Sequence, residues 1–215
     1  MAKPRLHIGD RNYSSWSMRP WLALRHAGVD FEEVMHALPE MGGKPSFGAI
    51  SPNARVPALD LGGGVVIAES LAICEWAAEQ NPAIWPKDAT LRALARAAAA
   101  IMHAGFSSLR NEAQMNIRRR TDASRMTADG LEDARRVDEL WREWLARSGG
   151  PFLFGDWSIA DAMYAPVVTR FVTYDIPRSP EAQAYIDRIW AEPHFAAWVK
   201  GAEAETRRLP RSDQS

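Results

Sequence analysis

The sequence has little of several features that would assign it to a particular class of protein. A single cysteine, Cys74, among 215 residues excludes an internal disulfide and favours a reducing cytoplasm. No run approaches the ~18–20 apolar residues of a membrane-spanning helix, and the N-terminus leads into too few apolar residues for a signal peptide. We therefore expect a cytoplasmic protein that has no membrane partner.

The net charge is also close to zero, and the sequence lacks the spacing of a metal-binding motif. A formal net charge of −1 gives no overall attraction to nucleic acid, so we expect no nucleic-acid partner. The five histidines are scattered and lack the His/Cys spacing of zinc sites, so no metal is expected. The composition, 47% hydrophobic and 25% charged, is that of an ordinary globular protein, and the length allows one large domain or two small ones.

The first 80 residues alternate short apolar runs with helical patterns. Strands are predicted at residues 6–8 and 31–35, after Pro57, and at 65–67. Three glycines at 62–64 predict a hairpin between the last two. Helical segments are predicted at 17–27 (starting within 14–17, if Pro20 lies in the first turn), at 44–50 as a short turn, and at 71–80. This βαβαββα order indicates a small mixed sheet of the thioredoxin-like kind.

The rest of the chain shows no convincing strand. Residues 81–88 contain two prolines and are interpreted as a linker. Helices are predicted at 89–111, 128–147, from Ser158 onward, at 181–191 and at 194–207. Ser158 and Asp161 have the spacing of a capping box. The predicted organisation is a thioredoxin-like domain at 1–80, a linker at 81–88 and an all-α domain at 89–215.

A serine-rich turn between the first strand and the first helix is the most informative stretch. Ser14, Ser15 and Ser17 lie where the first N–H groups of the helix have no intrahelical partners and where the helix dipole is positive. A serine oxygen at such a position caps the helix. A second hydroxyl, turned outward, can donate to an anion. From this stretch alone, a simple helix cap and an anion site both remain open.

Three motifs resemble those of the soluble glutathione transferases, in matching order and spacing. Tyr-Ser-Ser-Trp-Ser-Met-Arg at residues 13–19 is similar to the Ser-Ser-Cys-Ser-Trp-Arg run of the zeta class, which includes maleylacetoacetate isomerase. Asn-Ala-Arg-Val-Pro-Ala-Leu at 53–59, followed by Glu-Ser-Leu-Ala-Ile at 69–73, is similar to the family's glutathione-site sequence. Gly-Asp-Trp-Ser-Ile-Ala-Asp at 155–161 resembles the capping motif of its buried helix. The resemblance covers nearly the whole chain and implies a bacterial, serine-type glutathione transferase.

This resemblance implies a site for glutathione as cosubstrate. The Val56–Pro57 bond is expected to be cis, which would let the main chain of Val56 pair with the peptide backbone of glutathione. Ser70 and the first N–H groups of its helix suit a carboxylate, and Glu69 suits an ammonium group. The remaining glutathione-binding residues expected by resemblance are Trp16, Lys44 and Arg55.

The chemistry implied is activation of the glutathione thiol as a thiolate. Aligned on the zeta motif, Ser14 takes the catalytic place and Ser15 stands beside it, and which of them contacts the thiolate stays open. Trp16 replaces the cysteine of the zeta motif, which places isomerase activity in question. Tyr13 is a weaker candidate, and Cys74 is interpreted as inert core.

The small-molecule electrophile is expected between the two domains, against the first long helix. The residues expected to line its pocket are His103, Phe106, Ser107, Arg110 and Arg170. Arg170 and the basic run at 118–120 would attract an acidic substrate, although each of these residues taken singly also suits a structural or solvated role.

Three functions are compatible with these residues. The first is a glutathione transferase with a role in detoxification, which conjugates glutathione to an electrophile or uses it as a peroxide reductant. The second is a glutathione-dependent cis–trans isomerase of the maleylacetoacetate or maleylpyruvate kind. The third is a non-catalytic binding protein on the same fold. Retention of the first-helix hydroxyls and of the Glu69–Ser70 pair favours the first two. The resemblance also implies a homodimer, formed through the helix at 71–80 and the first long helix.

Overall fold

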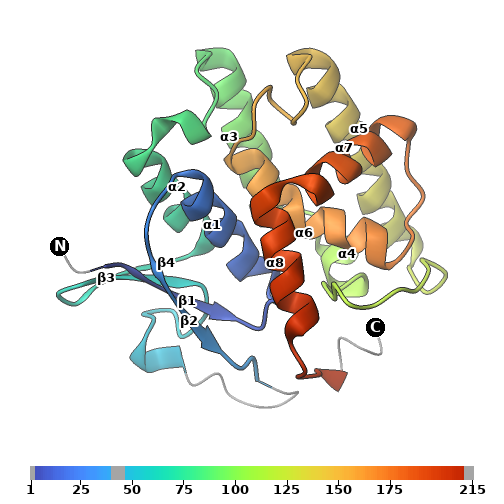
Figure 1. Ribbon diagram of the computed structural model, residues 1–215. Helices are drawn as coiled ribbons and strands as arrows, with labels where there is room; N and C mark the ends of the chain where they lie inside the picture. The colour runs from blue at the N-terminus through green and yellow to red at the C-terminus, as the bar shows by residue number, and fades with distance from the viewer. Residues whose placement is uncertain (1–2, 40–46, 211–215) are drawn as a thin grey trace.

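The computed structural model describes residues 3–39 and 47–210, and Figure 1 shows a sheet with two helices joined to a larger helical part. The N-terminal part consists of β1 (Arg5–Gly9), α1 (Ser15–His26), β2 (Glu32–His36), β3 (Ala58–Gly62), β4 (Val65–Ala68) and α2 (Ser70–Gln80). A 3-10 turn (Phe47–Ala49) stands where the second helix of the predicted order was expected. The thioredoxin-like arrangement is confirmed.

The four strands form one mixed sheet in the order β2-β1-β3-β4. β1 pairs in parallel with β2, opposite Glu33 at Leu6, and antiparallel with β3; β3 and β4 form the predicted hairpin. Leu6 and Ile8 are fully buried and alternate with His7, which lies on the other face. β1 ends at Gly9, and the turn that leads to the serine-rich start of α1 follows.

The C-terminal part is helical throughout its regular elements. It consists of α3 (Ala89–Ala104), α4 (Ser107–Glu112), α5 (Ala128–Ser148), α6 (Ile159–Thr173), α7 (Pro180–Ala191) and α8 (Pro193–Ala204), after a short 3-10 turn (Pro82–Ile84). α6 is buried at every position except Val172, and its capping box between Ser158 and Asp161 is present as predicted. The division into residues 1–80, 81–88 and 89–215 stays a proposal.

The single helix predicted at 89–111 is wrong in its length, because the helix is interrupted between α3 and α4. Gly105 ends α3, and a Cβ at this position would lie 2.8 Å from the carbonyl oxygen of Ile101. Phe106 then takes a left-handed conformation with φ of 57°. Gly105 was the sequence signal for this helix end, since glycine is a poor helix former, but the alanine-rich run before it favours a continuous helix.

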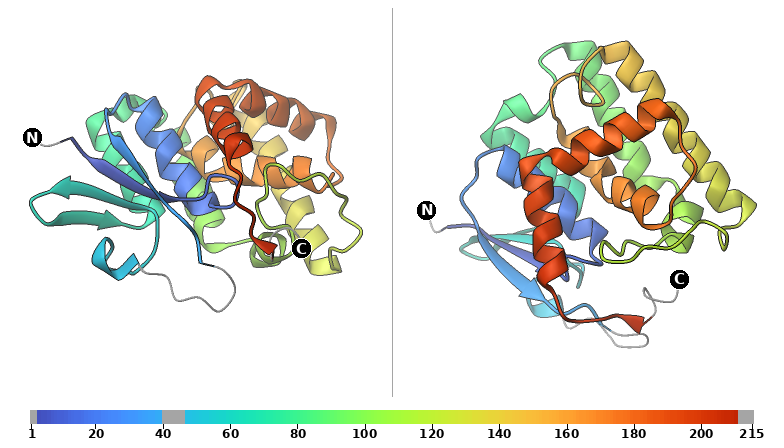
Figure 2. Two further views of the ribbon diagram at one scale, coloured as in Figure 1. Left: turned by 60° about the horizontal axis from the view of Figure 1, so that its bottom comes forward. Right: turned by 45° about the vertical axis from the view of Figure 1, so that its right-hand side comes forward.

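Two smaller expectations also differ from the structure. Pro20 is the sixth residue of α1 and so lies beyond the first turn, although the helix begins at Ser15, within the predicted range. The last long helix ends at Ala204 and not at residue 207. The segment that follows it passes beside the turn between β1 and α1 in both views of Figure 2.

The N-terminal and helical parts share α1 as a common packing element. α1 contacts α2 on one side and α6 and α8 on the other. Trp21 of α1 meets Trp198 of α8 edge to face, with ring centroids 5.4 Å apart. No helix among the described residues is long and apolar enough to cross a membrane.

Candidate active site at the junction of the two parts

The serine-rich turn places its hydroxyls at the start of α1. Ser14 is the N-cap, and its Oγ accepts from the main-chain N–H of Ser17 at 3.4 Å. The Ser14 hydroxyl also hydrogen bonds to Ser17 Oγ at 2.7 Å, and Ser17 Oγ accepts from the N–H of Gly9 at 3.1 Å. Ser15 is half-buried as the first helical residue. Ser14 thus combines the cap with a position at the positive end of the helix dipole.

A second helix start, that of α2, carries the predicted Glu69–Ser70 pair. Ser70 is fully buried, and its Oγ has no hydrogen-bond partner among the described residues. Glu69 has a φ of 96°, which is uncommon for a residue other than glycine. Its half-exposed carboxylate pairs with His103 Nε2 at 3.1 Å. A buried hydroxyl without a partner at a helix N-terminus indicates a site for a polar ligand.

Trp16 lies between residues of the two parts. The guanidinium of Arg19 lies 4.4 Å from its ring centroid, and that of Arg110 lies 4.7 Å from it. His103 meets the same ring edge to face at 5.3 Å. The structure therefore brings predicted residues of the glutathione site, Trp16 and Glu69, into contact with predicted residues of the electrophile pocket, Arg110 and His103.

Three arginines concentrate positive charge behind this tryptophan. Burial, followed by the charges of Arg110 and Arg170, lowers the pKa of Arg19 to about 9. Burial and the charge of Arg110 lower the pKa of Arg170 to about 10. Arg170 donates to the main-chain oxygens of Arg110, at 3.1 Å, and of Ala113. Nε and Nη1 of Arg19 have no partner among the described residues. The cluster favours an anion nearby.

The other residues predicted for the glutathione site are placed as follows. The Val56–Pro57 bond is cis, as expected, and precedes β3. Arg55 is exposed, and its N–H donates to Asn53 Oδ1 at 3.1 Å. Lys44 lies outside the described residues. The roles assigned to these side chains stay predictions.

The remaining predicted pocket residues lie at the start of α4. Phe106 is half-buried as the N-cap, and Ser107 is exposed as the first helical residue. The guanidinium of Arg110 donates to the main-chain oxygens of His103 and Gly105, so it spans the break between α3 and α4. Whether these residues line an electrophile pocket stays a prediction, as it does for Arg170.

The environments of Tyr13 and Cys74 argue against a catalytic role for either residue. The phenol oxygen of Tyr13 accepts from Arg118 Nη2 at 3.2 Å and from the N–H of Leu209 at 3.1 Å. Cys74 is fully buried, and burial raises the pKa of its thiol. Neither environment resembles that of an activated nucleophile.

One cluster of possible metal ligands lies at the opposite end of α1. His26, Glu192 and His194 offer ligand atoms within 4.8 Å of one another. The Glu192 carboxylate already caps α8, accepting from the N–H groups of His194 and Phe195 at 3.0 and 2.7 Å. Helix capping and packing therefore account for this cluster.

Sequence reasoning missed two residues of the site. Ser17 belongs to the serine-rich run, and its position three residues after the N-cap is the signal that could have revealed its bond to Ser14. Arg19 belongs to the motif at residues 13–19, and the motif alone does not predict its burial. Its helix packs against α2 and α6, which the local sequence does not reveal.

Comparisons with known proteins agree with this architecture. The family model "Glutathione S-transferase, N-terminal domain" matches residues 13–80. Maleylacetoacetate isomerase of Rattus norvegicus is 29% identical in an alignment of 189 positions that covers 83% of this chain and 83% of that protein. Maleylpyruvate isomerase of a Ralstonia species is 38% identical in an alignment of 116 positions that covers 51% of this chain and 54% of that protein.

Solved structures give the same result across the whole fold. A glutathione transferase homologue from Burkholderia, strain BGR1, with bound glutathione, has a TM-score of 0.70 and 26% identity, covering 94% of this chain and all of that one. The theta-class glutathione S-transferase of Xanthomonas axonopodis pv. citri, also with glutathione bound, has a TM-score of 0.68 and 26% identity over 93% and 98%. Residues 13–80 therefore match the N-terminal domain of the glutathione S-transferases, and the whole chain has the fold of the soluble glutathione transferases.

Proposed function

We propose that the protein is a glutathione transferase that binds glutathione as a thiolate and directs it at a small electrophile. The observation that carries this proposal is Ser70, whose fully buried hydroxyl lacks a partner at the start of α2. An unsatisfied buried hydroxyl costs about 1–3 kcal/mol, so its retention indicates a ligand that satisfies it. The γ-glutamyl carboxylate of glutathione fits Ser70, and its ammonium group fits Glu69.

The start of α1 supplies the means of stabilising a thiolate. Lowering a thiol pKa of ~8.5 by two units requires about 2.7 kcal/mol. One charge-assisted hydrogen bond from a serine contributes ~1.5–3 kcal/mol, and the helix terminus adds ~0.3–1 kcal/mol. Ser14 is the serine that we assign to this bond. In the structure the Ser14 hydroxyl donates to Ser17 Oγ at 2.7 Å. Because a hydroxyl can rotate and can both donate and accept, the Ser14 hydrogen can turn toward a bound sulfur while Ser17 donates to Ser14 Oγ instead.

A glutathione titration of the wild type and three alanine variants tests this assignment. Thiolate absorbance near pH 7 should be lost in Ser14→Ala, with binding retained, and should persist in Ser15→Ala. Ser70→Ala should keep its melting temperature without glutathione, because its hydroxyl has no partner there, and should lose most of the stabilisation that glutathione gives the wild type. A wild type that does not bind glutathione at millimolar concentration would refute the transferase and leave the non-catalytic binding protein.

A second candidate is a glutathione-dependent isomerase acting on a dicarboxylic acid. Arg110 and His103 lie against Trp16 at the face where the electrophile is expected, and Arg19 and Arg170 add positive charge behind them. Two relatives named above are isomerases of this kind. Isomerisation of maleylacetoacetate or maleylpyruvate, compared with conjugation of a chloronitrobenzene, separates the two functions. Preference for the dicarboxylate, lost in Arg110→Met, would favour the isomerase.

We also propose a homodimer formed through α2 and α3. A surface hollow between these helices is lined in part by Ala78, Trp85 and Arg96, and α3 has an alanine-rich surface suited to close packing. Gel filtration should give a species near twice the 24.0 kDa chain mass, and a species near that mass would refute the dimer. A cytoplasmic location and a role in detoxification belong to the same proposal.

A further inference from the structure

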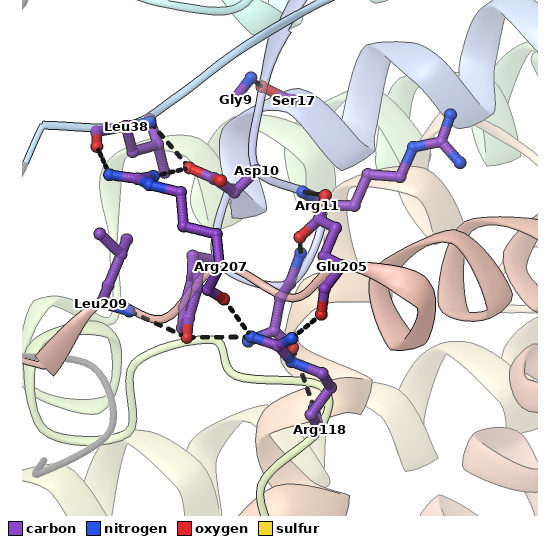
Figure 3. A network of polar contacts seen from close by, with 11 residues as sticks. Gly9, Asp10, Arg11, Ser17, Leu38, Arg118, Glu205, Arg207 and Leu209 are labelled. Atoms are coloured by element: carbon purple, nitrogen blue, oxygen red, sulfur yellow. Dashed lines mark hydrogen bonds and ion pairs between the residues drawn. The ribbon is translucent and has the colours of Figure 1, made fainter.

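We infer that Glu205 is a positioning residue for thiol activation, acting through the turn that carries Ser14. This inference rests on the proposed glutathione site. Two segments are involved: the serine turn, residues 10–14, and the C-terminal segment, residues 205–209, which follows α8. Figure 3 shows the C-terminal segment joined to the serine turn by several polar contacts, although about 190 residues separate them in the chain.

Glu205 binds the main chain of the serine turn directly. Its Oε1 accepts from the N–H of Arg11 at 2.6 Å, and its Oε2 accepts from the N–H of Asn12 at 3.0 Å. Hydrogen bonds to a carboxylate are roughly twice as strong as neutral ones. The side chain is half-buried, which limits competition from water. One carboxylate thus fixes two consecutive peptide groups just ahead of Ser14.

Two arginines fasten the same pair of segments. Arg118 donates to the main-chain oxygens of Glu205 and Arg207 and to the phenol oxygen of Tyr13. Arg207 pairs with Asp10 Oδ2 at 2.6 Å and donates to the main-chain oxygen of Leu38. Each residue from position 10 to 13 therefore has a polar contact with a residue of the helical part. The conformation of the serine turn thus depends on the helical part as well as on β1 and α1.

The geometry of Ser14 depends on this support. The main-chain oxygen of Asp10 accepts from the N–H groups of both Tyr13 and Ser14, at 3.1 and 2.8 Å. Displacement of the peptide groups of Arg11 and Asn12 would therefore move the Ser14 Oγ relative to the bound sulfur. A shift of about 1 Å in a catalytic group reduces rate by up to ~100-fold. Loss of the Glu205 carboxylate should act on the thiolate more than on the rest of the glutathione contacts.

The test compares Glu205→Gln and Glu205→Ala with Glu203→Gln and Glu203→Ala. Glu203 is exposed on the last turn of α8 and is a matched control. Two quantities are measured in each variant: amide hydrogen exchange at Arg11 and Asn12, and the pH titration of thiolate absorbance with glutathione bound. In Glu205→Ala we expect exchange at both amides to rise at least tenfold and the pKa of the bound thiol to rise by about one unit, equivalent to a tenfold loss of ionisation.

The near-isosteric Glu205→Gln keeps one acceptor oxygen, so it should fold and give an intermediate shift in both measurements. KM for glutathione should change less than threefold while kcat falls, because Ser70 and Glu69 are untouched. Unchanged exchange, or raised exchange with an unchanged thiol pKa, would overturn the inference, since a merely structural tether gives the second result. A wild type that forms no thiolate refutes the proposed function instead, which the wild type alone reveals before any variant is compared.

Discussion

At the scale of single residues, Arg19 buries a guanidinium whose Nε and Nη1 meet no acceptor among the described residues. Replacing such an unpaired charge with an apolar side chain of similar length removes a desolvation penalty. We expect Arg19→Met to raise the free energy of unfolding by about 1–3 kcal/mol in the absence of ligand, the change being measured by urea denaturation.

Arg25, on the same helix, is the matched control. It pairs with Glu33 at 2.7 Å and lies 4.6 Å from the ring of Phe31. Arg25→Met should therefore leave stability unchanged or lower it. A loss of stability in Arg19→Met comparable with that of a well-packed core truncation would show that Arg19 has a partner, and that anion binding does not explain its retention.

The sequence indicated some of these residues and not others, for a physical reason. Ser14 was predictable as a cap because capping depends on residues within one helical turn. Ser70 was predictable as the start of a helix because it follows directly after a strand, whereas its role in binding a ligand stays a prediction. Arg19 is buried on α1, a helix that packs against α2 and α6, elements that lie more than 50 residues away, and no local pattern reports this burial.

At the scale of elements, Asp161 fastens the start of α6 to its surroundings. Its carboxylate accepts from the N–H groups of Leu153 and Ser158, at 3.1 and 2.8 Å, from the Ser158 hydroxyl, and from Tyr185 OH at 3.0 Å. Asp161→Ala leaves buried donors unsatisfied. We expect a loss of about 2–4 kcal/mol in the free energy of unfolding, measured by denaturant titration.

Asp156 provides the control, because it is exposed in the same loop. Asp156→Ala should change stability by less than ~0.5 kcal/mol. Equal effects of the two substitutions would contradict the anchoring role. The capping box itself was predictable from its three-residue spacing, whereas the bonds to Leu153 and Tyr185 were not, since they join α6 to a loop and to α7.

A second element-scale prediction concerns the parallel pair of β1 and β2. His7 Nδ1 lies 2.9 Å from His36 Nε2, across these two strands. Burial, followed by the charge of His36, lowers the pKa of His7, and burial lowers the pKa of His36. Both imidazoles thus resist protonation in the folded state, so the unfolded chain takes up protons first as the pH falls below about 6.5. The free energy of unfolding should therefore decline as the pH falls from about 6.5 through the lowered pKa values of the two histidines in the folded protein.

Chemical denaturation of the wild type and of His36→Asn at a series of pH values between 7.5 and 5 checks this direction. The variant should show a shallower decline, because one of the two titrating rings is absent and the other has lost its cationic neighbour. Parallel curves would assign the decline to other groups. His194, whose pKa burial also lowers, contributes equally to both proteins and cancels in the comparison.

At the scale of the whole molecule, the order of a sheet-containing part followed by a helical part was predictable from the sequence, but the contacts between the two parts were not. Prolines at 82 and 86 marked the change from sheet to helices. The contacts across that boundary, such as Glu205 with the serine turn and His103 with Glu69, join residues that no periodicity relates. Sequence patterns report which face of a single helix or strand is buried, whereas these contacts depend on how the folded N-terminal and helical parts pack against each other.

The same contacts predict that the two parts unfold as one unit. α1 lies between α2 and α6, and Trp198 of α8 is fully buried and donates to the main-chain oxygen of Arg11 at 3.1 Å. We expect hydrogen exchange of amides in the sheet and in α5 to report the same global opening free energy. Trp198→Ala, which removes a core aromatic side chain, should lower both values together by about 3–5 kcal/mol. A fall confined to the helical part would show that the sheet is held without α8, and that the shared face of α1 is an interface between independently stable domains.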